Sequence, residues 1–214
     1  MTPLFATVCF DVDSTLVSIE GIDEIAEGSE EIAALTDAAM SGRIPIDEVY
    51  ERRLEIVRPD AARIEALGRR YVESIVPGAE SLIARLRSDR VAVRLITAGI
   101  EQAILPLAAH LGVPAGFVHA VPLRFDSVGS YAGYDQSAPT ARPGGKAVVI
   151  RNIRSRNKGP VAFVGDGVTD LETAPFVDRF IGFGGVVARD AVRGSAPHYV
   201  ETFEQLVPLL YGEE

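Results

Sequence analysis

Two aspartates one residue apart, Asp11 and Asp13, follow an apolar run at residues 4–10 and precede Ser14 and Thr15. Two carboxylates this close repel each other unless a cation lies between them. Because Mg²⁺ prefers oxygen ligands, the pair indicates a metal site, although Asp and Ser are also common in ordinary turns after a strand. An ionised carboxylate oriented by a metal can act as a nucleophile, and a neighbouring carboxyl group can transfer protons.

A second acidic cluster, Asp166 and Asp170, follows another apolar run at residues 160–164. Lys146 comes directly after two glycines at the predicted start of a helix. Backbone N–H groups favour anions there, and a plain surface lysine is the alternative interpretation. Thr97 follows a third apolar run and offers a hydroxyl group. Together these residues divide into a group that could hold a metal and a group that could hold a phosphoryl group.

The elements that must position these residues alternate along the second half of the chain. Because strands alternate with helices, the sequence predicts an α/β fold with a parallel sheet, whose ligands gather at the carboxyl ends of the strands. Residues 116–135 are expected to form a β-hairpin flap, in which 118–121 belongs to the flap and not to the core sheet. Strands are predicted over 4–10, 91–96 and 160–164, and a strand followed by a glycine turn over 179–185. Helices are predicted over 79–88, 101–111, 202–210 and from 142–146 to 154.

Residues 20–75 have a different pattern. Apolar spacing of three and four predicts helices over 22–26, 32–40, 46–56 and 61–72, and no strand. Pro45 and Pro59 are plausible helix boundaries, and Asp60 is a predicted N-cap. The sequence therefore predicts a helical cap over residues 16–75, inserted into a core formed by residues 1–15 and 76–214. The charged runs of the cap are expected to be mostly solvated helix faces.

The composition excludes several classes of protein. The chain has 214 residues, which is long enough for one α/β domain with a sizeable insertion or for two small domains, and its 47% of hydrophobic residues indicates a globular protein. A net charge of −9 argues against a broad nucleic-acid or membrane surface. The sequence has no apolar run near the ~20 residues that span a bilayer, so we expect a cytoplasmic protein, either monomer or homodimer. The single cysteine, Cys9, is expected to be a buried, inert side chain.

The whole set of motifs resembles that of the haloacid dehalogenase superfamily of phosphatases. The four main motifs are matched by Asp11 to Thr15, Thr97, Lys146 and residues 165–170. The resemblance covers nearly the whole chain, and it implies a Rossmann-like parallel sheet with a helical cap and a β-hairpin flap. It also implies a Mg²⁺-dependent phosphomonoesterase. Further matching stretches are residues 20–24, 131–135, 144–146 and 180–185.

The resemblance also implies roles for the acidic residues. Asp11 would be the nucleophile, and Asp13 would be the general acid and base. The side chains of Asp11 and Asp166 and the main-chain carbonyl of Asp13 would bind Mg²⁺, with Asp170 supporting the metal. The cap would close over the substrate and exclude water until the phosphoenzyme has formed.

For the substrate, the resemblance implies L-phosphoserine and a role in serine biosynthesis. Glu20 would meet the ammonium group and Arg53 the carboxylate, since such charge-assisted pairs recognise a zwitterion. Two ordinary surface charges of the cap are the alternative. The phosphate would be held by Thr97, Ala98, Gly99 and Lys146.

Several positions depart from the family pattern, namely Ala98, Ile100, Ile46, Val121 and Pro122. An added methyl group at Ala98 can alter a tight substrate fit without altering the mechanism. Two alternatives therefore stay open: hydrolysis of another small phosphate monoester, and phosphoryl transfer to another alcohol instead of water. A non-catalytic phosphate-binding protein is a third alternative, and the intact acidic residues argue against it.

Overall fold

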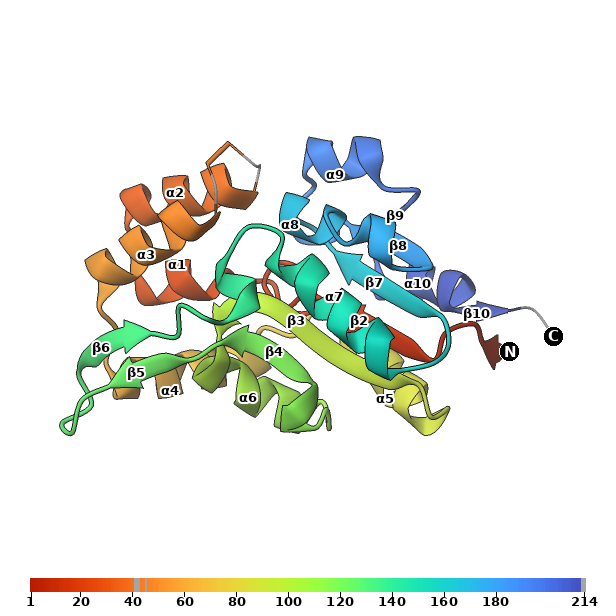
Figure 1. Ribbon diagram of the computed structural model, residues 1–214, viewed down its shortest axis with the longest axis horizontal. Helices are drawn as coiled ribbons and strands as arrows, with labels where there is room; N and C mark the ends of the chain where they lie inside the picture. Colours follow the sequence, from red (N-terminus) through yellow and green to blue (C-terminus); the bar gives the residue numbers. More distant parts are fainter. Residues whose placement is uncertain (41–42, 45, 213–214) are drawn as a thin grey trace.

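Six parallel strands form the central sheet of the computed structural model, which describes residues 1–40, 43–44 and 46–212 (Figure 1). The strand order is β4, β3, β2, β7, β8, β9. In the middle of the sheet, Phe10 lies beside Leu95 on one side and Val164 on the other. The predicted α/β class with a Rossmann-like parallel sheet is thus confirmed. The strands are β2 (Thr7–Phe10), β3 (Ala92–Ile100), β4 (Val118–Val121), β7 (Val161–Gly165), β8 (Arg179–Phe183) and β9 (His198–Val200).

Helices cover both faces of this sheet (Figure 1). Successive side chains of a strand point to opposite faces, so Val8 and Phe10 share one buried apolar cluster while Cys9 belongs to another. The first cluster includes side chains of α5 (Ala79–Ser88), α6 (Glu101–His110) and α10 (Phe203–Leu210), and the second those of α7 (Gly145–Arg156). Cys9 is buried as predicted, and burial raises its pKa to about 12, which makes the thiol inert.

Four helices lie between β2 and α5: α1 (Gly21–Ile25), α2 (Glu30–Met40), α3 (Ile46–Val57) and α4 (Ala61–Glu73). The segments that lead from β2 into these helices and from the helices to α5 lie side by side, because Val17 forms an antiparallel bridge with Ile75. Asp60 is the N-cap of α4, and its carboxylate accepts a hydrogen bond of 2.8 Å from the Arg63 N–H. α4 packs against α6. The predicted helices therefore form, and the boundary expected at Pro45 lies outside the described residues.

The prediction that residues 118–121 belong to the flap is wrong. These residues form β4, which pairs in parallel with β3 at the edge of the sheet, with Val118 beside Leu95. Only β5 (Leu123–Phe125) and β6 (Tyr131–Tyr134) form the antiparallel hairpin. Pro122 is the single residue between β4 of the sheet and β5 of the hairpin. Because proline has no N–H to continue a ladder, the chain leaves the sheet there and enters the hairpin at once.

Short elements complete the fold. The predicted strand over 4–10 begins later, at Thr7, because the segment before it forms a separate antiparallel pair with the end of the chain. This pair consists of β1 (Thr2–Pro3) and β10 (Tyr211–Gly212). The remaining elements are η1 (Ala115–Phe117), η2 (Pro139–Ala141), α8 (Val168–Leu171), η3 (Ala174–Phe176) and α9 (Asp190–Ser195).

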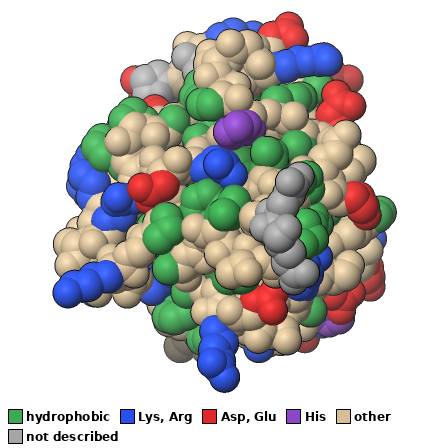
Figure 2. Space-filling view, turned by 90° about the vertical axis from the view of Figure 1, so that its right-hand side faces the viewer, with side chains coloured by type: hydrophobic (Ala, Val, Ile, Leu, Met, Phe, Trp, Pro, Cys, Tyr) green, Lys and Arg blue, Asp and Glu red, His purple; other side chains and the backbone are tan. Residues whose placement is uncertain are grey.

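The surface at the end of the molecule that carries both termini is chemically mixed. Figure 2 shows basic side chains standing singly there among acidic, apolar and polar ones. Such a mixed face fits the negative net charge of the chain better than it fits a polyanion-binding surface. Within the described ranges, no helix has the length and apolar character needed to cross a membrane.

Candidate active site

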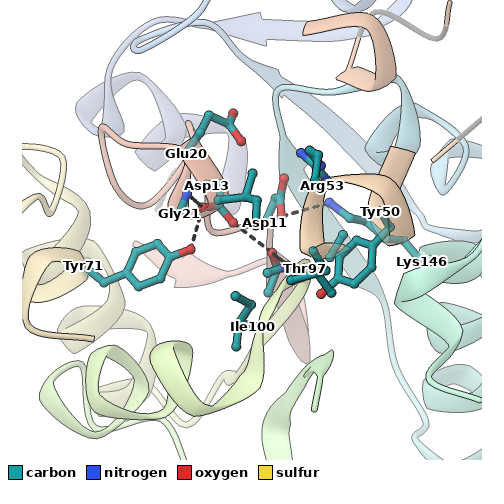
Figure 3. Close-up of a pocket in the computed structure, with 14 residues that line it drawn as sticks. Asp11, Asp13, Glu20, Gly21, Tyr50, Arg53, Tyr71, Thr97, Ile100 and Lys146 are labelled. Atoms are coloured by element: carbon teal, nitrogen blue, oxygen red, sulfur yellow. Dashed lines mark hydrogen bonds and ion pairs between the residues drawn. The ribbon is translucent and has the colours of Figure 1, made fainter. Parts of the chain in front are cut away.

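A pocket lies where β2 and β3 end, beside helices α1, α3 and α4 (Figure 3). Asp11 and Asp13 follow β2, Thr97 belongs to the last part of β3, and Lys146 lies in the first turn of α7. Because parallel strands end at the same edge of the sheet, residues far apart in the sequence meet here. The structure brings eight of the predicted residues to this pocket: Asp11, Asp13, Glu20, Arg53, Thr97, Ala98, Gly99 and Lys146.

Lys146 is a buried cation between two carboxylates and not a surface lysine. Its Nζ lies 2.8 Å from Asp11 Oδ1 and 2.6 Å from Asp170 Oδ1, and its side chain is 5% exposed. Burial opposes the charged form of Lys146, but the carboxylates of Asp11 and Asp170 outweigh burial, so the pKa of Lys146 is raised. The ammonium group therefore stays charged beside Asp11.

Asp166 lies next to this cluster and has its own partners. The Thr15 hydroxyl donates a hydrogen bond of 3.1 Å to Asp166 Oδ1, and Arg189 Nε donates one of 2.9 Å to Asp166 Oδ2. Arg189 also approaches the Glu20 carboxylate, with Nη2 3.4 Å from Oε1. The guanidinium group of Arg189 thus links Asp166, which follows β7, to Glu20, which precedes α1.

Three buried carboxylates could hold a metal ion together. Asp11, Asp166 and Asp170 each offer an oxygen atom, and these oxygens lie within 4.8 Å of one another. Burial and then the nearby charge of Asp11 raise the pKa of Asp166 to about 6, and the same two causes raise that of Asp170 well above its ordinary value. A divalent cation would relieve this repulsion, so the donor set fits Mg²⁺.

Asp13 is held by a ring of donors. Its Oδ1 accepts hydrogen bonds of 2.7 Å from both the Gly21 N–H and the Tyr71 hydroxyl, and the Thr97 hydroxyl lies 3.3 Å from its Oδ2 (Figure 3). Burial raises the pKa of Asp13, and the hydrogen bond from Tyr71 counteracts part of that effect. The nearby Gly99 N–H donates a bond of 2.9 Å to Thr97. These contacts fix the carboxyl group in the pocket, where it could exchange a proton with a bound molecule.

The two charged residues predicted for substrate recognition differ from typical surface charges, because Arg53 is buried and the Glu20 side chain is only 18% exposed. Glu20 Oε1 accepts a hydrogen bond of 2.7 Å from the Ser14 hydroxyl. Burial, followed by the charges of Asp13 and Asp166, raises the pKa of Glu20 well above its ordinary value. Arg53 is 4% exposed. A bound ammonium group near Glu20 and a bound carboxylate near Arg53 would each neutralise a buried charge.

The positions that depart from the family pattern lie at different distances from the pocket. Ala98 and Ile100 line the pocket, whereas Val121 is buried in β4 and is not among the residues that line it. The side chain of Ile46 lies outside the described part of the structure. Among the described departures, Ala98 and Ile100 are therefore the ones that could affect substrate fit directly.

Sequence reasoning missed three contacts of the site. Tyr71 occupies an apolar position of α4, where core packing is the simplest interpretation, and Gly21 lies in a helical start without a charge or hydroxyl group to draw attention. Arg189 comes after the carboxyl end of β8, and that position at the edge of the sheet is the signal that could have found it.

Residues 5–177 match the haloacid dehalogenase-like hydrolase family. The chain therefore belongs to the haloacid dehalogenase-like hydrolases and is an enzyme of the phosphatase type, as the spaced aspartates and Lys146 predict. Phosphoserine phosphatase from Bos taurus is 38% identical to it over 207 residues, which are 95% of this chain and 92% of the bovine one.

Two solved structures share the fold. A phosphoserine phosphohydrolase-like protein from Francisella tularensis has a TM-score of 0.87 and 23% identity, and the match covers 99% of this chain and 100% of that chain. A substrate-bound phosphoserine phosphatase complex has a TM-score of 0.82 and 21% identity, covering 99% of both chains. The overall fold is therefore common to these proteins.

Proposed function

We propose that this protein is a Mg²⁺-dependent phosphomonoesterase that hydrolyses L-phosphoserine to serine and phosphate in serine biosynthesis. The observation that carries the proposal is the presence of Glu20 and Arg53 in the same pocket as Asp11 and Lys146. A phosphate at one end and a zwitterion at the other is the ligand that such a charge pattern fits. The relative from Bos taurus, which bears the name phosphoserine phosphatase, supports this substrate.

The reaction would begin with Asp11. Its carboxylate oxygen attacks phosphorus, the bond between phosphorus and the serine oxygen breaks, and an aspartyl-phosphate forms. Asp13 gives its proton to the departing serine oxygen, and the resulting carboxylate then takes a proton from water. That water attacks phosphorus, releases phosphate and restores Asp11. The hydrogen bonds from Gly21 and Tyr71 would keep Asp13 oriented through both steps.

The phosphoryl group would be held by Lys146 and the Thr97 hydroxyl, both of which line the pocket. Mg²⁺ would be held by Asp11, Asp166 and the main-chain carbonyl of Asp13, with Asp170 in a supporting role. When bound, the ion would neutralise the negative charge between the carboxylates and the phosphoryl oxygens. Asp170 also accepts a hydrogen bond of 2.9 Å from the Gly167 N–H, which would keep it in position.

We also propose that residues 16–75 act as a cap on a core formed by residues 1–15 and 76–214. The pairing of Val17 with Ile75, where the two connections meet, supports this division. The cap contributes Glu20, Arg53 and Tyr71 to the pocket, so it would choose the substrate while the core performs the chemistry. A cytoplasmic location and a monomeric or homodimeric state stay predictions.

Phosphate release in the presence of Mg²⁺ tests the function. The panel contains L-phosphoserine, phosphothreonine, phosphoethanolamine and sugar phosphates, and we expect the highest kcat/KM with L-phosphoserine. A preference for a compound without an amino-acid zwitterion would contradict the proposed substrate. Asp11→Asn should abolish turnover while the protein stays folded by circular dichroism, and near-normal turnover would contradict the nucleophile assignment.

A second candidate function is suggested by Ala98, whose methyl group lines the pocket. It is the hydrolysis of another small phosphate monoester, or phosphoryl transfer to another alcohol. The same panel, repeated with added amino alcohols as acceptors, separates the two functions. A new phosphate ester formed faster than free phosphate would favour the second.

A further inference from the structure

One face of helix α3 carries two residues that enter the pocket. Tyr50 and Arg53 are three positions apart, so they lie on the same side of the helix. Both residues are 4% exposed. In Figure 3 the ring of Tyr50 comes from α3 on the side of Arg53, whereas Tyr71 approaches from the opposite side. The cap therefore places a phenol group next to a guanidinium group in the pocket.

Each of the two residues carries a buried polar atom without a partner. Among the described residues, the hydroxyl of Tyr50 and the Nε of Arg53 have no hydrogen-bond partner, although Arg53 Nη1 donates a bond of 3.0 Å to Thr36. Buried polar groups are nearly always satisfied in folded proteins, because an unmet donor costs free energy. Two unmet donors on one wall of a pocket point to a ligand that brings acceptor oxygens to that wall.

The Tyr50 ring is fixed by its neighbours. Tyr134 of the hairpin meets it edge-on, with ring centroids 5.2 Å apart, and the Arg53 guanidinium carbon lies 5.9 Å from its centroid. Burial raises the pKa of Tyr50 above its ordinary value, so the phenol keeps its proton at any working pH. The hydroxyl is thus a pre-positioned neutral donor.

On the basis of the proposed function, we propose that the Tyr50 hydroxyl donates a hydrogen bond to the substrate carboxylate beside Arg53. It therefore makes this enzyme selective for phosphomonoesters that carry a carboxylate. The bond would be charge-assisted. The Tyr50 hydroxyl would give up no contact with water to form it, because the hydroxyl is buried, and it would break no bond to a described residue, because it has no partner there. The hairpin takes part indirectly, since Tyr134 holds the ring that presents the hydroxyl.

The test is Tyr50→Phe, which removes one oxygen atom and keeps the ring. We expect kcat/KM for L-phosphoserine to fall roughly 10- to 100-fold, which is the usual effect of losing a hydrogen bond to a charged group. For phosphoethanolamine, which has no carboxylate, kcat/KM should stay unchanged. The matched control is Tyr131→Phe on the hairpin, because Tyr131 undergoes the same chemical change outside the pocket and should leave both substrates unaffected.

A structural role for the hydroxyl predicts a different result. If the hydroxyl only supported the cap, its removal would lower the melting temperature and affect both substrates equally. We expect the melting temperature of the substrate-free Tyr50→Phe protein to be equal to or higher than that of the wild type, because an unsatisfied buried donor is removed. Equal losses on both substrates, or a lowered melting temperature, would overturn the proposal.

The wild-type panel keeps this proposal separate from the proposed function. A wild-type enzyme without activity on L-phosphoserine would overturn both. A wild-type enzyme that prefers L-phosphoserine, together with a Tyr50→Phe variant of unchanged preference, would overturn the role of Tyr50 alone. A double variant with Arg53→Ala adds a further check, because two residues that bind one carboxylate should show non-additive losses.

Discussion

Replacing Lys146 by methionine tests the charge balance of the site most directly. Methionine keeps an unbranched apolar chain but removes the ammonium group that lies 2.6 Å from Asp170 and 2.8 Å from Asp11. A solvent-exposed ion pair would contribute at most about 1 kcal/mol. Here the Lys146 side chain is 5% exposed and that of Asp170 is 0% exposed, so the variant would leave buried carboxylates without their cation.

Breaking a buried pair from one side usually costs about 3–5 kcal/mol, and we expect a loss of that order in the free energy of unfolding. Urea unfolding without metal, near neutral pH, measures it. The loss should shrink as the pH falls. Without Lys146 the native pKa of Asp170, which burial already raises, rises further above its unfolded value, so the native state binds more protons and gains stability on acidification. Added Mg²⁺ should restore part of the stability, because it binds the folded carboxylates.

A double variant supplies the control. Asp170→Asn added to Lys146→Met replaces a buried charge by a neutral amide, so the double variant should be more stable than Lys146→Met alone. A Lys146→Met protein within ~0.5 kcal/mol of the wild type would refute the reasoning, since changes of that size are typical of surface sites. So would a double variant that is less stable than the single one.

Three further variants test other parts of the structure. Gly21→Ala would place a Cβ 2.0 Å from the Tyr71 hydroxyl oxygen, so we expect Tyr71 to move, kcat to fall and KM to change little; an unchanged kcat would contradict this. Tyr71→Phe removes one of the hydrogen bonds to Asp13 and should lower kcat about tenfold, and a larger effect on KM than on kcat would argue against a role at Asp13. Burial, followed by the charge of Arg94, lowers the pKa of His119 from 6.5 to about 4, so protons favour the unfolded state and stability should decrease as the pH falls through this range. Unfolding curves across that range should show a weaker pH dependence for His119→Asn, and an equal slope in both proteins would count against a half-buried, neutral His119.

The residues that meet at the candidate site could be predicted from the sequence because strand ends are visible in it. Asp11, Thr97 and Asp166 each stand where an apolar run stops or nears its end, and parallel strands bring such positions to one edge. Lys146 could be found for a similar reason, since two glycines mark the start of its helix. Local patterns of this kind do not depend on how distant helices pack.

The contacts that sequence reasoning missed depend on tertiary packing. Tyr71 has the spacing of a core residue, and only the approach of α4 to Gly21 brings its hydroxyl to Asp13. Arg189 has many possible acidic partners in the sequence, and the fold selects Asp166 and Glu20. The failure at residues 118–121 has the same origin, because the sequence does not show where an edge strand pairs.

The features that cost stability in this pocket are the ones that a substrate would relieve. Asp11, Asp166 and Asp170 crowd negative charge that a divalent cation could balance, and burial raises the pKa of Glu20, which an ammonium group would lower again. On the wall formed by α3, the Tyr50 hydroxyl and Arg53 Nε have no acceptor among the described residues, and a bound carboxylate would supply one. A ligand that supplies the missing charges and acceptors binds only the folded state and therefore stabilises it. Mg²⁺ and L-phosphoserine together should thus raise the melting temperature of an inactive Asp11→Asn protein more than phosphate does. An active site of this kind gives up stability in the free enzyme and regains it as binding free energy.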